Sequence, residues 1–564
     1  MEKIKKLKKL FNNFDLDGYV VPKNDEFFSE YVSKDKDNLK YITNFTGSYG
    51  FALILKKKNY LFVDGRYTIQ AKKESGKLFK IIQIHKYLPH KILKNICLGF
   101  DPKLFTKAQI NFYFGKNIYL KPIERNLVDK KYTNLNNLFP FYSIPSKITG
   151  KSHKYKISLV CKLIKKKNAD YLFISAPENV AWLLNIRGSD VPFSPIPNCN
   201  LLIRKDKKIH IIADSEKLKN LLKEKKISKK QIISPNNFQN FIKYLNGQKM
   251  IIDSKTCSIF NENIISSKFK INLREDPCYY LKSQKNETEI KYMKKAHIED
   301  GVALTKFIHW IKNTTNTEIT EISAEKKLEN LRKKSKNFLY PSFNTISGAE
   351  SNGAIVHYRA NKKTNKKIKK NHIFLCDSGG QYKYGTTDVT RTMCFSNQSI
   401  KIKNIFTKVL KGHIAVATCN LNKNNTGAKI DIQARKFLKK DGLDYEHGTG
   451  HGVGFFSNVH EGPQSISKFN KVKLKPGMIL SNEPGYYKEG KFGIRIENLV
   501  FVEENKKKLY FKNLTLAPID RDLINYKLLS TKEKDYLFKY HLDVYCKISK
   551  YLNFKERKWL ASFI

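Results

Sequence analysis

Long apolar runs are missing from this 564-residue sequence. No run approaches the roughly 18 residues that suggest a membrane-spanning helix. The basic N-terminal segment "MEKIKKLKKLFNNFDLDGYVV" also lacks the continuous apolar stretch of a secretory signal. We therefore expect a cytoplasmic protein that is not associated with a membrane.

Paired cysteines are missing as well. The chain has nine cysteines, an odd number, and no two of them have C-x-x-C spacing. This pattern argues against a disulfide framework and against a zinc ribbon. We interpret the cysteines as buried, reduced thiols.

Acidic residues are few compared with basic ones, 51 against 106, which gives a net charge of +55. Such an excess raises the possibility of nucleic-acid binding. The lysines are dispersed along the chain, however, and residues 361–372 form the one dense basic run. A binding groove needs clustered basic and aromatic side chains, so we do not expect a nucleic-acid partner and keep that function only as an alternative.

The length and the pattern of segments predict three domains of mixed α/β (α+β) class. Residues 1–150 alternate strand-like and helical runs, with a hairpin in "FALILKKKNYLFVDGRY". Residues 151–278 repeat this rhythm, and "DYLFIS" there echoes the earlier "DGYVVP", which suggests two related units in tandem. Residues 279–564 form the third and largest domain.

A long helix is predicted to open the third domain. Asn286 and Glu289 have the spacing of a capping box. Apolar residues then recur at helical spacing on one face, at Leu304, Phe307, Ile308 and Ile311.

Four acidic residues stand out in the third domain. Asp377 ends one strand-like run and Asp388 lies within the next, so a hairpin could bring them together. Glu483 lies at a strand end, before Pro484-Gly485. Glu497 interrupts the alternating strand "GIRIENLVFV", where a lone acid facing a core is costly unless it is paired or binds a metal.

The segment "HGTGHGVGFFSNVHEGP" (447–463) adds three histidines and several glycines to this domain. Four carboxylates and about one imidazole suit a pair of divalent ions, with Mn²⁺, Co²⁺ or Zn²⁺ as candidates. Two such ions can share a hydroxide and stabilise a tetrahedral intermediate, which is the equipment of metal-assisted hydrolysis.

An ordered set of motifs resembles a known family. These are "DSGGQY…TTDVTRT", "HGTGHGVG", "NVHEGP", "SNEPGYY" and "FGIRIEN" in the third domain, with "NFTGSYGFALIL", "ENVAWLLNIRGSDVPFSP" and "PSFNTISGAESNGAIVHY" before them. They resemble the metallopeptidases of the pita-bread fold, and most closely the three-domain Xaa-Pro aminopeptidase (aminopeptidase P) branch. The resemblance implies two creatinase-like α/β domains followed by a pita-bread catalytic domain.

The resemblance also implies two metal ions, most often Mn²⁺, held by five residues. Asp377 would bind one ion, Asp388 and Glu497 would bridge both, and His451 and Glu483 would complete the ligand shell of the other ion.

Further residues acquire roles only through the resemblance. His357 matches a histidine that stabilises the tetrahedral intermediate, and His460 one that contacts the substrate backbone. His447 matches a residue of the proline pocket, although a turn residue is the alternative. Arg495 and Tyr487 match a pair that supports a bridging carboxylate. Arg495 could instead pair with Glu497 or a surface acid, and His357 could be a core histidine.

The function implied is a dinuclear metallo-aminopeptidase that hydrolyses the bond between an N-terminal residue and proline, with a bridging hydroxide as nucleophile and Glu483 or a neighbour as proton relay. Its partners would be peptides with proline in second position, and a homodimer is the family-level expectation. A prolidase, restricted to dipeptides, shares most of these ligands and is the main alternative. A metal-free scaffold that binds nucleic acid through its basic surface is the alternative of another class.

Overall fold

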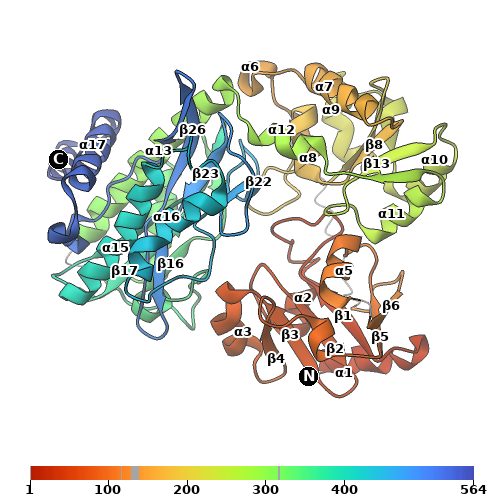
Figure 1. Ribbon diagram of the computed structural model, residues 1–564, viewed down its shortest axis with the longest axis horizontal. Helices are drawn as coiled ribbons and strands as arrows, with labels where there is room; N and C mark the ends of the chain where they lie inside the picture. The colour runs from red at the N-terminus through yellow and green to blue at the C-terminus, as the bar shows by residue number, and fades with distance from the viewer. Residues whose placement is uncertain (1, 116, 129–138, 315–317) are drawn as a thin grey trace. The chain divides into compact units, whose positions relative to one another are not determined.

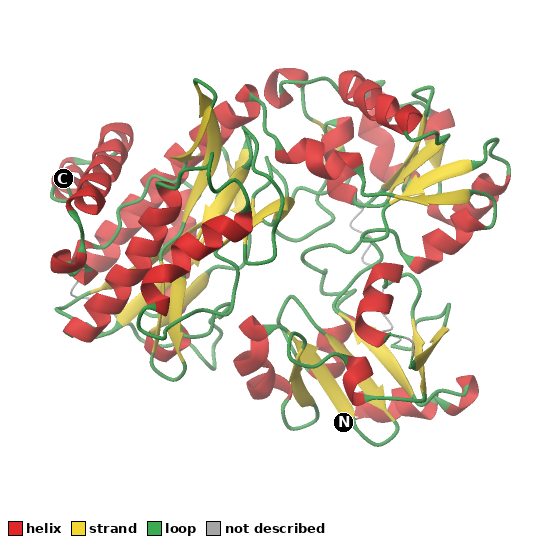
Figure 2. Ribbon diagram, viewed as in Figure 1, coloured by secondary structure: helices red, strands yellow, loops and turns green. Residues whose placement is uncertain are grey.

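The computed structural model describes residues 2–115, 117–128, 139–314 and 318–564. The chain divides into two units, Met1–Leu281 and Lys282–Ile564, and each has its own hydrophobic cores. Figure 1 shows the first unit in red to yellow-green and the second in green to blue. Strands and helices alternate in both, so the predicted mixed α/β class is confirmed (Figure 2).

Two six-stranded sheets organise the first unit. The order of the first sheet is β4(Lys80–Gln83), β3(Asn59–Val63), β2(Phe51–Leu55), β1(Gly18–Pro22), β5(Ile96–Phe100), β6(Ile118–Pro122). The order of the second is β12(Ile232–Ile233), β11(Ile209–Ile212), β10(Asn200–Arg204), β8(Tyr171–Ile174), β13(Lys249–Ile252), β14(Lys270–Leu273). Strands β7(Tyr142–Ser143) and β9(Ile186–Arg187) form a separate antiparallel pair.

The two sheets have the same topology. In each, the fourth strand (β1 or β8) is antiparallel to the third and parallel to the fifth. The second and third strands are antiparallel, whereas the outer pairs are parallel. The predicted echo between "DGYVVP" and "DYLFIS" therefore reflects equivalent strands, and the predicted hairpin is the β2–β3 pair.

Helices accompany these sheets throughout the first unit. Their bounds are α1(Glu2–Lys9), α2(Asn38–Thr43), α3(Thr68–Ser75), α4(Pro89–Ile92), α5(Lys107–Phe114), α6(Ser146–Thr149), α7(His153–Lys166), α8(Pro177–Leu184), α9(Lys219–Lys223), α10(Phe238–Lys243), α11(Ile259–Ser266) and α12(Pro277–Ser283). The last of these reaches the start of the second unit.

The described residues of the second unit form four sheets. Two are three-stranded, β15(Phe338–Pro341)–β18(Gly380–Tyr382)–β19(Gly385–Thr386) and β16(Ile346–Ala349)–β17(Ile373–Ser378)–β20(Val389–Cys394). The five-stranded sheet has the order β22(Glu461–Ile466), β21(Gly450–Gly452), β23(Ile479–Asn482), β26(Asn498–Asn505), β27(Lys508–Asn513). Strands β24(Gly485–Lys488) and β25(Phe492–Arg495) form the fourth sheet.

Long helices pack along these sheets, as Figure 1 shows for α13, α15 and α16. The helices of this unit are α13(Glu287–Asn313), α14(Glu321–Arg332), α15(Ile400–Ala417), α16(Gly427–Lys439), α17(Thr531–Ile548) and α18(Phe554–Ala561). One core joins α15 and α17 to β25, and another joins α15 and α16 to the five-stranded sheet.

Helix α13 follows the sequence prediction closely. Asn286 caps its N-terminus and forms a capping box with Glu289. The predicted apolar face is buried. It packs with Phe374 and Met393 of the sheet formed by β16, β17 and β20.

None of the helices in the described ranges is both long and apolar enough to cross a membrane. The predicted boundary near residue 278 lies close to the division between the two units, and the boundary near 150 lies between the two six-stranded sheets. The precise limits of the three domains stay predictions.

Candidate metal centre

Asp377 and Asp388 lie at the ends of paired strands. Asp377 is in β17, which pairs antiparallel with β20 so that Asp377 faces Thr390. The sequence had suggested that Asp388 lies within a strand, but Asp388 immediately precedes β20. The chain between them forms β18 and β19 of another sheet in place of a single turn. Both aspartates are buried.

His451 and Glu483 come from neighbouring strands of the five-stranded sheet. His451 is in β21 and Glu483 directly follows β23, the predicted strand end. Ser481 links them, because its Oγ accepts a hydrogen bond from the His451 amide at 2.9 Å and donates to Glu483 Oε1 at 3.0 Å. The backbone N–H of Glu483 donates to the carbonyl of Thr449 at 2.8 Å.

Glu497 lies at a break between two strands. The sequence pattern predicted one continuous strand, but β25 ends at Arg495 and β26 begins at Asn498. The break arises because β25 pairs with β24, whereas β26 pairs with β23. Thr390 Oγ1 holds the buried Glu497 carboxylate with a 2.8 Å hydrogen bond to Oε2.

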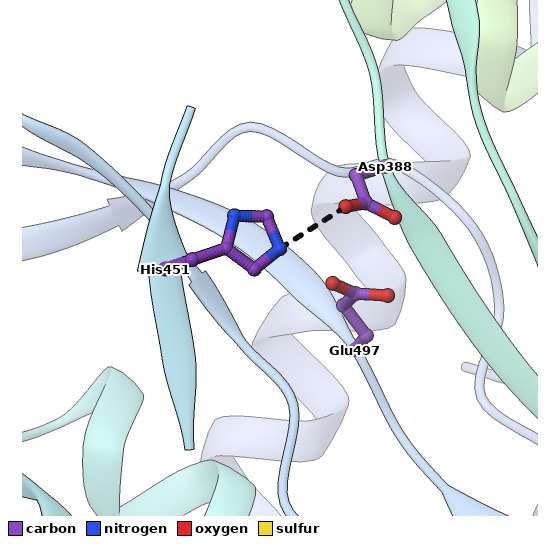
Figure 3. A group of neighbouring side chains, drawn as sticks. All are labelled: Asp388, His451 and Glu497. Carbon is purple, nitrogen blue, oxygen red and sulfur yellow. Dashed lines mark ion pairs between the residues drawn. The ribbon is translucent and has the colours of Figure 1, made fainter. Parts of the chain in front are cut away.

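Three of these side chains converge on one point. Asp388, His451 and Glu497 offer ligand atoms that all lie within 4.8 Å of one another (Figure 3). His451 Nε2 is 3.4 Å from Asp388 Oδ2 and 3.5 Å from Glu483 Oε1. Two donors about 2.1 Å from one ion at a tetrahedral angle are about 3.4 Å apart, so this spacing suits a shared cation.

The hydrogen bonding of His451 also favours a cation. Its Nδ1 lies 2.9 Å from the carbonyl oxygen of Gly452, which can only accept, so Nδ1 carries the proton in the neutral ring. The lone pair of Nε2 then faces carboxylate oxygens, which are acceptors too. A positive ion between them resolves this mismatch.

The carboxylates are incompletely satisfied. Oδ1 of Asp377 and Oδ1 of Asp388 are buried and have no hydrogen-bond partner in the described part of the chain. Burial, together with the charges of Asp377 and Glu483, raises the pKa of Asp388 well above its usual range. Burial and the Asp388 charge do the same for the pKa of Glu497. Bound divalent cations would fill the open lone pairs and remove the repulsion, so these residues fit a metal centre.

Glu483 behaves differently from its acidic neighbours. Burial by itself would raise the pKa of Glu483, but the nearby imidazoles of His451 and His447 and the charge of Arg495 bring it below its usual value. The cluster therefore combines one readily ionised carboxylate with others that need a counter-charge.

Arg495 connects the carboxylates to a second group of residues. Its guanidinium donates to Asp377 Oδ2 at 2.6 Å, to Thr390 Oγ1 at 3.0 Å and to the Tyr487 hydroxyl at 2.6 Å. Arg495 thus binds Asp377 directly and reaches Glu497 only through Thr390. The support for a bridging carboxylate that the resemblance implies for Arg495 stays a prediction.

His447 extends the same network. Its Nε2 is 2.9 Å from the Tyr487 hydroxyl, and its Nδ1 is 2.7 Å from the carbonyl oxygen of Gly448. Burial lowers the pKa of His447 to about 4, so the ring is neutral at physiological pH. Tyr487 therefore donates to His447 and accepts from Arg495.

The two other predicted histidines lie on loops. The ring of His460 lies beside that of His451, with centroids 4.1 Å apart and ring planes inclined by 53°, and its side chain is exposed. His357 is half-buried in the loop that follows β16 and the short 3₁₀ helix Glu350–Asn352. The roles of all predicted site residues stay predictions.

Two contacts at this site escaped the sequence-based prediction. Thr390 and Ser481 orient Glu497, Glu483 and His451 through hydrogen bonds, and neither residue was among the predicted site residues. The available signal was their position in the sequence, because Thr390 lies two residues after Asp388 and Ser481 two residues before Glu483.

Four family models match successive segments of the chain. A model described as Metallopeptidase family M24 matches residues 291–504, and one for the C-terminal region of peptidase M24 matches 507–562. Models described as Creatinase/Prolidase N-terminal domain match residues 3–117 and 136–289.

Relatives match over nearly the full length. A probable Xaa-Pro aminopeptidase P of Laccaria bicolor is 37% identical, covering 99% of this chain and 92% of its own. Xaa-Pro aminopeptidase 1 of Dictyostelium discoideum is 36% identical, covering 100% and 96%.

A solved structure matches the fold. The X-prolyl aminopeptidase of Caenorhabditis elegans, described as a cytosolic enzyme with a di-nuclear active site, has 29% identity and a TM-score of 0.91, covering 100% of this chain and 98% of its own. The chain therefore belongs to metallopeptidase family M24, among the members with creatinase/prolidase N-terminal domains that are similar to Xaa-Pro aminopeptidases over their whole length.

Proposed function

We propose that the chain is an Xaa-Pro aminopeptidase, a metal-dependent hydrolase that removes an N-terminal residue from a following proline. The observation that carries the proposal is the cluster around His451, where two buried carboxylate oxygens have no hydrogen-bond partner among the described residues and His451 Nε2 lies close to carboxylate oxygens. Full-length similarity to Xaa-Pro aminopeptidases supports the substrate class.

The metal ligands in this proposal are Asp377, Asp388, His451, Glu483 and Glu497. When bound, two divalent cations would supply Lewis acidity and make a water molecule acidic enough to act as a nucleophile near neutral pH. Arg495 and Thr390 hold the carboxylates Asp377 and Glu497 in place.

The remaining assignments concern substrate and protons. His460, exposed beside the His451 ring, is placed to contact the substrate backbone. His357 is assigned a hydrogen bond to the carbonyl oxygen on which negative charge develops. Glu483 is assigned the relay of a proton to the departing prolyl nitrogen.

Proline in the second position sets a chemical constraint. An Xaa-Pro bond is a tertiary amide with no N–H, so recognition cannot use that donor and must accommodate a ring. The neutral ring of His447 presents a flat, weakly polar surface, which supports the assignment of His447 to the proline pocket.

A prolidase is the alternative that receives less support. The prolidase of Thermococcus sibiricus is 26% identical with a TM-score of 0.53, and the similarity covers 65% of this chain. The C. elegans X-prolyl aminopeptidase covers all of it.

Three finer statements belong to the same proposal. A cytosolic location is supported by the description of the C. elegans enzyme. The chemistry of the ligand set supports Mn²⁺, with Co²⁺ or Zn²⁺ as alternatives. The homodimer stays a prediction from the resemblance.

The test compares three peptides. We expect metal-stripped protein supplied with Mn²⁺ to release arginine from Arg-Pro-Pro and to leave Arg-Ala-Ala intact. Cleavage of the dipeptide Arg-Pro and not of Arg-Pro-Pro would identify a prolidase. No release with Mn²⁺, Co²⁺ or Zn²⁺ would overturn the proposal.

A further inference from the structure

Glu321 is the first residue of α14 and is fully buried. It is not one of the predicted metal ligands. Its Oε1 accepts hydrogen bonds from the Ala349 amide at 2.8 Å and from Asn352 Nδ2 at 2.9 Å. Its Oε2 accepts from the Tyr358 hydroxyl at 2.8 Å and from the Lys366 amide at 2.9 Å. All four donors are uncharged groups.

These donors use the full acceptor capacity of one carboxylate. An ionised glutamate has about four lone-pair positions, and each oxygen of Glu321 here receives at least two donors, since Asn352 Nδ2 also lies 3.1 Å from Oε2. A glutamine could not replace it, since its NH₂ group would face two of the same donors. The site therefore needs a carboxylate and has no vacancy for a cation.

The four donors bracket a single segment, residues 349–366. Cross-links within the segment add to its order: Asn352 Nδ2 also lies 2.8 Å from the Tyr358 hydroxyl and donates to the Thr364 carbonyl at 3.0 Å. After Ala349, the last residue of β16, the segment has no helix or strand other than the short 3₁₀ helix Glu350–Asn352. Its conformation thus depends on side-chain hydrogen bonds.

The distal end of the segment has a second anchor. The Glu321 amide donates to the Lys366 carbonyl at 3.0 Å, and the Ile368 amide donates to the Ile319 carbonyl at 2.8 Å. Loss of the carboxylate would therefore release the part next to Tyr358 while the chain at 366–368 stays paired.

His357 lies within this segment, directly before Tyr358. We propose that Glu321 is a positioning residue that fixes the loop 350–365 so that His357 is held at the reaction centre; this rests on the proposed aminopeptidase function. Glu321 does not touch the substrate, and its effect on catalysis passes through His357.

The test uses Glu321→Gln, with Glu329→Gln as matched control. Glu329 is on the same helix and forms a surface pair with Lys333. Supporting residues of this kind are worth about 10- to 100-fold in activity, so we expect kcat on Arg-Pro-Pro to fall about 10- to 100-fold in Glu321→Gln. KM and bound metal should stay close to those of Glu329→Gln, since no metal ligand is altered.

A double-variant comparison separates positioning from general damage. In a His357→Ala background, Glu321→Gln should lower kcat by less than about twofold, because residues that act as a unit are not additive. An undiminished effect in that background would overturn the proposal, as would an unchanged kcat in Glu321→Gln. If Glu321→Gln does not fold, Tyr358→Phe, which removes one donor and keeps the carboxylate, takes its place, with the same dependence on His357.

Hydrogen exchange keeps this test separate from the proposed function. The amides of Ala349 and Lys366 should exchange at least about tenfold faster in Glu321→Gln than in Glu329→Gln, because each loses its acceptor. If the wild-type protein cleaves no Xaa-Pro peptide, the proposed function fails while this measurement still decides whether Glu321 fixes the loop. Unchanged exchange would overturn that role.

Discussion

Two buried acidic sites in the same unit make opposite use of their carboxylates. Around His451, Asp377 and Asp388 each have one oxygen with no hydrogen-bond partner among the residues that the structure describes, and burial raises the pKa of Asp388 and Glu497. At Glu321, both oxygens receive hydrogen bonds from neutral donors. The first arrangement is costly without a cation, and the second is complete in itself.

The difference separates a binding site from a structural one. Buried polar groups are almost always hydrogen-bonded, so several unmet acceptors in one place indicate a missing positive partner. A fully bonded carboxylate instead fixes the segments that donate to it. Burial and charge alone do not distinguish a cation-binding carboxylate from a structural one. The number of hydrogen-bond donors that reach its oxygens does.

The largest expected effect comes from Glu497→Gln. Removing one charge from the cluster should lower Arg-Pro-Pro cleavage by about 10³-fold or more, because a single group that stabilises the transition state is already worth 10²–10³. The assay is released arginine at saturating Mn²⁺. Glu504→Gln, an exposed acid in β26, is the control and should keep its activity. Activity of Glu497→Gln within tenfold of that control would contradict the assignment.

Stability without metal should move in opposite directions at the two sites. Asp388→Asn removes a buried charge that is repelled by its neighbours, so we expect the metal-free protein to gain about 1–3 kcal/mol in free energy of unfolding. Glu321→Gln leaves buried donors unpaired and should lose about 1–3 kcal/mol. Urea unfolding in chelator measures both. Changes of the same sign would remove the distinction between the sites.

A buried histidine outside both sites provides the reference for pH. His541 Nε2 accepts the Ile519 amide at 3.1 Å, and burial lowers its pKa to about 3. In the unfolded chain the histidine pKa is about 6.5, so on acidification the unfolded chain takes up a proton before the folded protein does. The free energy of unfolding therefore falls as the pH drops below about 6.5. Between pH 6.5 and 5, the free energy of unfolding should fall by about 2 kcal/mol less in His541→Gln than in wild type. Equal pH slopes in urea unfolding would contradict this reading.

The smallest expected effect is that of Ser481→Ala. Its hydroxyl links the His451 amide to Glu483, so its loss should weaken Mn²⁺ affinity or activity by about tenfold. Ser467→Ala, at a half-buried position after β22, is the control. A Mn²⁺ titration that cannot distinguish the two variants would assign Ser481 no part in holding the ligands.

Local patterns predicted much of this fold. The capping box of α13, its buried face and the β2–β3 hairpin each depend on residues close in sequence. The two related units of the first half were predicted because the equivalent strands β1 and β8 have similar sequences. Such features are set by helix and strand periodicity, which a single sequence reveals.

Contacts over long sequence distances could not be predicted in the same way. The break before Glu497 arises because β25 and β26 join different sheets, which an alternating pattern does not reveal. Thr390 meets Glu497 across 107 positions. Glu321 reads as an ordinary acid in the first turn of a helix, where the helix dipole alone would favour it. Only the fold shows that its donors lie 28 to 45 residues away.

The most direct test of the cation hypothesis counts bound metal. Protein stripped with chelator and then equilibrated with Mn²⁺ should bind two ions per chain, and the second should restore arginine release from Arg-Pro-Pro. Asp388→Asn should bind fewer ions and stay inactive. A chain that cleaves Arg-Pro-Pro equally well with no metal bound, or an Asp388→Asn variant that binds two ions as tightly as wild type, would contradict the account.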